Sequence, residues 1–126
     1  MIIDHVYEES HLTVHTCSGT ISSKELHDAI KALHEKEPNP YHLWDLTDAD
    51  LSLVTGKDVE ELAAFIKQQA PPRLRGRSAI VTSTDFIFGL SRMFEAFTEI
   101  SGLGIEVRVF RVRQEAEEWL KAAPDN

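Results

Sequence analysis

The sequence predicts an α/β domain in which a mostly parallel five-stranded sheet is covered by four helices. Two observations support this class: short apolar segments alternate with longer segments of helical periodicity, and Gly or Pro residues separate many of them. The expected order is β-β-α-β-α-β-α-β-α, and the N-terminal strand is expected to pair antiparallel. The 126 residues are expected to form one domain, because no linker or change of composition divides them.

The first two strands and the first helix are expected before residue 40. Residues 2–7 and 12–17 are short, partly alternating segments joined by polar residues, so they predict a hairpin that ends at Gly19. Residues 22–25 read Ser-Ser-Lys-Glu, a capping box that begins a helix. The apolar stripe of this helix comprises Leu26, Ile30 and Leu33. Pro38 and Pro40 are expected to end it.

A central strand and a second helix follow. Leu43, Trp44 and Leu46 are the apolar residues of the strand. Thr55 begins the helix, because Asp58 three residues later completes a box-like cap. Val54 and Val59 take the two positions of a hydrophobic staple around this cap, and Pro71-Pro72 ends the helix.

The remaining elements are read in the same way. Residues 78–82 form an apolar strand, as a central parallel strand requires. A third helix runs from about 85 to 100 and stops before Gly102 and Gly104. Residues 105–110 form the last strand. The final helix carries its apolar stripe at Ala116, Trp119, Leu120 and Ala123.

The composition excludes several classes of protein. The formal net charge of -8 argues against nucleic acid or an anionic membrane as the main partner, because both attract basic patches. Cys17 is the single cysteine, so no intrachain disulfide forms and a reducing compartment is expected. The N-terminus lacks the pattern of a signal peptide, and no apolar run reaches the ~20 residues of a membrane span. The expected location is the cytoplasm.

The strand Leu43-Trp44-Asp45-Leu46-Thr47 and the segments Val107–Phe110 and Glu115–Leu120 resemble the STAS superfamily, the fold of anti-sigma-factor antagonists. The likeness is closest to the SpoIIAA-like group, also called STAS/SEC14-like, and covers nearly the whole chain. It implies a binding module rather than an enzyme. Some members of this group have been linked to apolar ligands through likeness to lipid-transfer domains.

In the phosphorylated members of the superfamily, an Asp-Ser-Ser-Gly turn opens the second helix, and its first Ser is modified. The matching positions here are Leu53-Val54-Thr55-Gly56. Val54 stands at the phosphorylated position and has no hydroxyl, so the resemblance implies a domain without that switch. For Thr55 two compatible interpretations stay open, an N-cap and a phosphorylation site, and the cap is the one we expect.

Three polar groups are candidates for a site. His15 and Cys17 share a strand face that His5 could approach, which suggests a metal site or a Cys-His nucleophile. A metal needs three or four ligands, so we expect partly exposed strand residues instead, and no metal or other cofactor. Asp45, Asp48 and Asp50 follow the central strand, and we expect a polar loop rather than a cation site. The third group is basic and comprises Arg73, Arg75 and Arg77, which occupy alternate positions before the fourth strand. We expect these side chains to aid solubility rather than to bind an anion. We expect His27 and His34 to lie on a solvated helix face.

The third helix contains more apolar residues than one core face requires. Its expected core stripe comprises Ile87, Leu90, Phe94 and Phe97. Phe86, Phe88 and Met93 lie outside this stripe, and Phe65 lies beside the stripe of the second helix. These four side chains predict either a wide buried face or a groove or contact surface between helices two and three.

The sequence therefore predicts a non-enzymatic domain that binds, and two functions stay open. The first is a regulatory or protein-interaction module that docks a protein partner or a second copy of itself. The second is a carrier or sensor of a small apolar, lipid-like ligand held between helices two and three. An enzyme ranks third, because no nucleophile–base pair or cofactor motif is visible.

Overall fold

The computed structural model describes residues 1–35, 39–69, 76–102 and 104–122. Its nine elements appear in the predicted order. They are β1 (Ile2–Tyr7), β2 (Leu12–Thr20), α1 (Ser23–His34), β3 (Tyr41–Asp50), α2 (Gly56–Gln69), β4 (Gly76–Val81), α3 (Asp85–Ser101), β5 (Ile105–Phe110) and α4 (Arg113–Lys121). The prediction of an α/β fold with one antiparallel strand pair is therefore confirmed.

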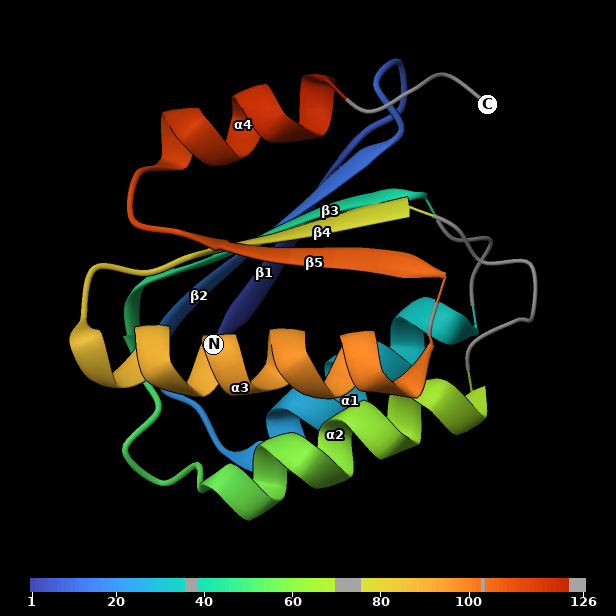
Figure 1. Ribbon diagram of the computed structural model, residues 1–126. Helices are drawn as coiled ribbons and strands as arrows, with labels where there is room; N and C mark the ends of the chain where they lie inside the picture. Colours follow the sequence, from blue (N-terminus) through green and yellow to red (C-terminus); the bar gives the residue numbers. More distant parts are fainter. Residues whose placement is uncertain (36–38, 70–75, 103, 123–126) are drawn as a thin grey trace.

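The strands lie in the sheet in the order β1-β2-β3-β4-β5, with β1 antiparallel to β2 and the other pairs parallel. Each parallel connection therefore moves one strand further in the same direction. Right-handed connections that keep one direction place their helices on one face of the sheet. Figure 1 shows this arrangement: α1, α2 and α3 lie on one face, and α4 alone covers the other.

Alternation along each strand divides the side chains between two cores. On β3, Trp44 and Leu46 face the three-helix side, whereas Leu43 belongs to the core beneath α4. The three-helix core also contains Cys17 and Ile21, and the smaller core contains Ala116 and Leu120 of α4. The expected core stripe of α3 is confirmed, because all four of its residues pack into the three-helix core.

Two strands extend beyond their predicted ends. Gly19, expected to end the hairpin, pairs with Ala49, and Thr20 pairs with Asp50. The register shifts between Thr16 and Ser18, and the backbone of Gly19 has a φ of 70°, a conformation that glycine adopts without steric cost. β3 consequently includes Asp48 and Asp50, which had been expected in a loop.

The predicted helix starts are confirmed by their hydrogen bonds. The Glu25 amide donates to Ser22 Oγ at 3.2 Å. At α2 the Asp58 amide donates to Thr55 Oγ1 at 3.1 Å, and Asp58 Oδ2 accepts from the Thr55 amide at 2.9 Å. These bonds satisfy helix-end amides that have no partner within the helix. Thr84 caps α3 by accepting from the Ile87 amide, a cap that had not been predicted.

Three predicted stop signals lie outside the described residues: Pro38, Pro71 and Pro72. Ala123, the last residue of the stripe predicted for the final helix, also lies outside them. The same holds for Arg73 and Arg75 of the basic group. Arg77 is described, and its guanidinium donates to the Trp119 carbonyl oxygen at 2.8 Å and lies over the Trp119 ring. Among the described helices, none is long and apolar enough to cross a membrane.

Candidate functional site

A cavity of about 160 Å³ lies between the sheet and the three helices that cover its larger core. Its floor comes from β3, β4 and β5, and its roof from α1, α2 and α3. Most of the lining is apolar. The apolar lining includes Leu26, Ile30 and Leu33 of α1, Leu62 and Ile66 of α2, Leu90 and Phe94 of α3, and Trp44, Ile80 and Val107 of the sheet.

The packing of α1 explains why this space exists. The helix turns its stripe of Leu26, Ile30 and Leu33 toward the sheet, yet none of its twelve residues is fully buried. Protein cores are normally packed with few voids larger than a water molecule, because lost contacts cost dispersion energy. A helix that holds its apolar face over an open space therefore marks a place where another apolar group can add contacts.

One end of the cavity is polar. Its residues are His34 of α1, Asn39 before β3, His42 of β3 and Ser78 of β4. His42 and Ser78 are partners in the parallel register, so they lie side by side near the amino ends of their strands. This end differs from the carboxyl end of the sheet, where parallel α/β folds usually bind ligands.

A glycine permits the close packing behind this polar end. The Arg77 amide donates to the Pro40 carbonyl oxygen at 3.0 Å. A Cβ atom built on Gly76 would lie 1.8 Å from that same oxygen. Because no side chain fits there, Gly76 allows the chain before β3 to lie against the start of β4.

A partly buried hydrogen-bond network supports the wall of the cavity. His15 is 1% exposed, and its Nδ1 lies 2.7 Å from Asp4 Oδ1. His15 Nε2 lies 3.0 Å from His42 Nδ1, and His42 Nε2 lies 2.9 Å from the Asn39 carbonyl oxygen. The two rings stack on each other, and His15 also stacks on Trp44 at 3.8 Å between ring centroids.

The network lacks one hydrogen when both imidazoles are neutral and Asp4 is ionised. Three contacts join Asp4, His15, His42 and the Asn39 carbonyl, and each contact needs one hydrogen. Two neutral imidazoles supply two, and an ionised carboxylate supplies none. All three bonds form when the pair of Asp4 and His15 holds one further proton, in which case the network carries no net charge.

Burial governs the titration of both rings. It lowers the pKa of His15, although the hydrogen bond and the charge of Asp4 act in the opposite direction. It lowers the pKa of His42 to about 4, with the neighbouring charge of His15 as the second cause. His42 is therefore uncharged at neutral pH, and the polar end of the cavity presents no cation from this residue.

The switch-like positions serve the structure of α2. Val54 is buried and contributes to the cavity wall, as does Val59, its partner in the staple. Thr55 is exposed and caps the helix. A Cβ atom on Gly56 would lie 2.8 Å from the terminal methyl group of Met93, so this glycine lets Met93 pack against the start of α2.

The four apolar residues outside the core stripe have separate surroundings, and none of them lines the cavity. Phe65 packs on His27 of α1 at 5.0 Å between ring centroids. Phe88 lies beneath the guanidinium of Arg111, 4.2 Å from ring centroid to Cζ. Phe86 is 54% exposed, and Met93 is 39% exposed and packs against the start of α2. The structure therefore does not bring all four together in one groove.

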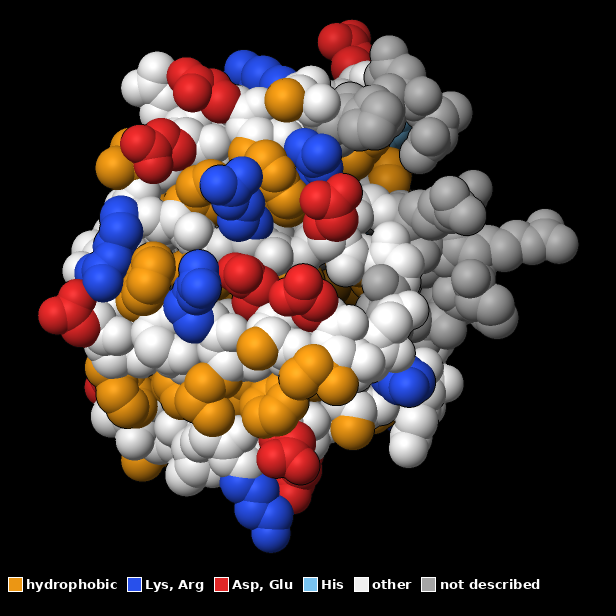
Figure 2. All heavy atoms as spheres, viewed as in Figure 1, with side chains coloured by type: hydrophobic (Ala, Val, Ile, Leu, Met, Phe, Trp, Pro, Cys, Tyr) orange, Lys and Arg blue, Asp and Glu red, His pale blue; other side chains and the backbone are white. Residues whose placement is uncertain are grey.

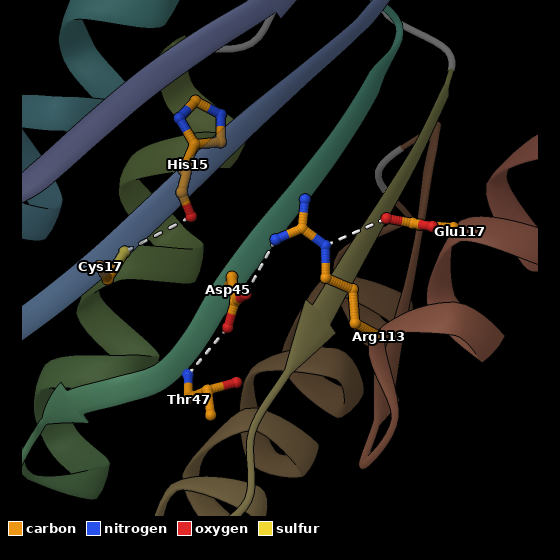
Figure 3. A network of polar contacts seen from close by, with 6 residues as sticks. All are labelled: His15, Cys17, Asp45, Thr47, Arg113 and Glu117. Carbon is orange, nitrogen blue, oxygen red and sulfur yellow. Dashed lines mark hydrogen bonds and ion pairs between the residues drawn. The ribbon is translucent and has the colours of Figure 1, made fainter.

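Asp45 and Asp50, two members of the acidic group of β3, are held by hydrogen bonds and an ion pair. Figure 3 shows Asp45 accepting from the Thr47 amide at 3.0 Å and from Arg113 at 3.2 Å, while Arg113 also pairs with Glu117. Asp50 accepts from the Ser52 amide and from the Thr20 hydroxyl, which lowers its pKa. Among the described residues no group of three or more His, Cys, Asp or Glu side chains is arranged to hold a metal ion.

Cys17 and His15 are buried, which contradicts the expectation of partly exposed strand residues. Burial raises the pKa of the Cys17 thiol to about 12, so the thiol stays protonated at neutral pH and is a poor nucleophile. Its weak hydrogen bond to the His15 carbonyl oxygen is drawn in Figure 3. His5 pairs with Val14 rather than with His15, so it lies on the opposite face of the sheet.

The polar end of the cavity was not predicted from the sequence. His34 had been assigned to a solvated face, yet it lines the cavity next to the apolar stripe. The signal was its spacing of four residues from Ile30, which places both on one helix face. His42 alternates with Trp44 and Leu46, so a strict period of two would have placed it on the inward face.

Comparison with protein-family models gave no match, and comparison with curated proteins gave none either.

Proposed function

We propose that this protein binds a small apolar ligand in the cavity between α1, α2, α3 and the sheet. The observation that carries the proposal is the cavity itself, about 160 Å³ and lined mostly by aliphatic and aromatic side chains. An engineered apolar cavity of roughly 150 Å³ stays dry and takes up benzene, so the space fits a ligand of about that size. The resemblance to the SpoIIAA-like group, itself a proposal, agrees with this function.

The proposal also explains the loose packing of α1. An amphipathic helix without a fully buried residue is held by fewer contacts than its neighbours, so it can move away from the sheet at low cost. Entry of a ligand would then proceed beneath α1, and the bound ligand would add contacts to Leu26, Ile30 and Leu33. Binding of this kind stabilises the folded state by mass action.

The direct test measures binding of benzene and of n-hexane, by NMR titration and by the shift of the thermal midpoint. Both probes should raise the midpoint in proportion to the logarithm of their concentration above Kd. Val107→Phe should abolish the effect, because Val107 lines the cavity and a phenyl ring would fill part of it. Val109→Phe is the matched control, since Val109 lies on the same strand outside the lining. Binding of neither probe to the unmodified protein would refute the proposal.

A second candidate function rests on exposed apolar side chains of α3. Phe86, Met93 and Ile100 are exposed there, seven residues apart, so they form one stripe along the helix. Figure 2 shows a band of apolar side chains across the face of the molecule on which α3 lies, with charged side chains above it. We propose that a second copy of this chain packs against the stripe, because a two-fold dimer joins identical surfaces.

The oligomeric state tests this second candidate. Analytical ultracentrifugation of the unmodified protein should show a monomer–dimer equilibrium, and Met93→Glu should shift it toward monomer because a charge would be buried in the contact. Leu53→Glu is the control, since Leu53 is 66% exposed in the loop before α2. A monomer at all concentrations would remove this candidate and leave the cavity unaffected.

A further inference from the structure

The charge of the cavity lining restricts the chemistry of its ligand. Among the described residues that line the cavity, six have polar side chains, and none of these six is Lys, Arg, Asp or Glu. A carboxylate or phosphate taken out of water is costly unless a cation or several donors compensate it. His42, whose pKa burial lowers to about 4, also carries no charge at neutral pH. An anionic head group therefore finds no cationic partner among the described lining residues.

The polar end nevertheless keeps hydrogen-bonding capacity. Both ring nitrogens of His42 are already engaged, one by His15 and one by the Asn39 carbonyl. The Asn39 amide nitrogen donates to Thr13 Oγ1 at 3.0 Å. His34 Nδ1, in contrast, is buried and has no hydrogen-bond partner. Ser78 supplies a hydroxyl to the same end of the cavity.

A buried polar atom without a partner is uncommon in native structures and costs about 1–3 kcal/mol, so it calls for an explanation. In the described part of the chain there are two such side-chain atoms, His34 Nδ1 and Glu95 Oε2, and His34 alone lines the cavity. A hydroxyl group both donates and accepts, so it can bond to an imidazole nitrogen whichever tautomer His34 adopts. It can also pair with the hydroxyl of Ser78.

We propose that the ligand is a small uncharged amphiphile of the alcohol or phenol class, whose hydroxyl binds at His34 and Ser78 and whose apolar part lies under α1. This inference rests on the proposed function and specifies its ligand. The selectivity comes from two physical effects that act together. The uncharged lining excludes carboxylates and phosphates, and the unpartnered His34 Nδ1 favours a hydroxyl over a purely apolar molecule of equal size.

The test compares three probes that differ only in the head group: benzene, phenol and benzoate. Affinities are measured by isothermal titration calorimetry and NMR at pH 7.5. Phenol should bind about tenfold more tightly than benzene, as expected for one or two net hydrogen bonds, and benzoate at least tenfold more weakly than benzene. The series n-hexane, 1-hexanol and hexanoate repeats the comparison with a flexible chain, so that ring shape does not decide the result.

Two variants locate the effect. Ser78→Ala should reduce the preference for phenol over benzene several-fold while leaving the affinity for benzene within about twofold. Ser91→Ala is the matched control, because Ser91 also lines the cavity but belongs to α3 rather than to the polar end, and it should leave the preference unchanged. His34→Leu should invert the preference, since a buried hydroxyl would then lack a partner.

The outcomes separate this inference from the function on which it rests. If benzene and n-hexane bind but phenol and 1-hexanol bind more weakly, the hydroxyl site is refuted and apolar binding stands. If benzoate or hexanoate binds most tightly, the argument from lining charge is refuted. If the affinity for phenol is unchanged in Ser78→Ala and His34→Leu, the site has been placed wrongly. If no probe of either series binds, both the inference and the proposed function fail.

Discussion

Replacing His42 with glutamine should flatten the dependence of folding stability on pH below neutrality. The folded protein binds a proton at His42 only near pH 4, because burial and the adjacent charge of His15 oppose it. The unfolded chain binds that proton near the ordinary value of 6.5. Between these two values the unfolded state holds more protons, so the free energy of unfolding falls as the pH is lowered.

The magnitude follows from the two pKa values. Their difference corresponds to about 3 kcal/mol, present in full above pH 6.5 and lost progressively as the pH falls toward 4. Glutamine does not titrate, and its amide can still donate to the Asn39 carbonyl oxygen in place of His42 Nε2. The loss of stability on acidification should therefore be smaller in His42→Gln by roughly this amount.

Urea unfolding at pH 7.5, 6.5, 5.5 and 4.5 measures the effect as a difference between the two proteins. Carboxylates elsewhere also bind protons in this range, but they contribute equally to both curves and cancel in the difference. The difference should change by about 2 kcal/mol or more across the series. A difference that stays constant would show that His42 is not desolvated as the structure indicates, and the reasoning would fail.

Asp4→Asn tests the hydrogen count in the same network. With an ionised Asp4 as acceptor, neutral His15 must carry its hydrogen on Nδ1. An asparagine amide can donate to that nitrogen instead, which moves the hydrogen of His15 to Nε2 and completes all three bonds without an extra proton. Long-range nitrogen-15 NMR of the histidines at pH 7.5 should record this change of tautomer. An unchanged Nδ1–H tautomer in the variant would contradict the count.

Substitutions at one helix cap and at two glycines give further tests by urea unfolding. Thr55→Ala should cost about 1 kcal/mol through the lost cap, and a change below roughly 0.3 kcal/mol would show that the cap does not contribute. Gly76→Ala should cost more than about 2 kcal/mol, because its Cβ atom would meet the Pro40 oxygen at 1.8 Å. Gly89→Ala should instead stabilise by about 0.5–1 kcal/mol, because the position is helical and nothing lies within 4 Å of the added atom. Equal effects of the two glycine variants would refute at least one of these two predictions.

The sequence alone determined the order and type of every element, and it did so through local physics. The caps at Ser22 and Thr55 are decided by residues three positions apart, so they can be read without knowledge of the fold. The alternation of short apolar strands with amphipathic helices also predicted a mostly parallel sheet. The ends of β2 and β3 were misjudged, because pairing between the two strands extends them and pairing is not a local property.

Only the tertiary structure decided where the candidate site lies. The cavity depends on how far α1 stands from the sheet, and no pattern within α1 encodes that distance. The network of Asp4, His15 and His42 joins three strands, so its members are brought together by register rather than by spacing along the chain. Periodicity indicates which face of an element is buried. What that face meets, and whether a space remains beneath it, is decided when the layers pack.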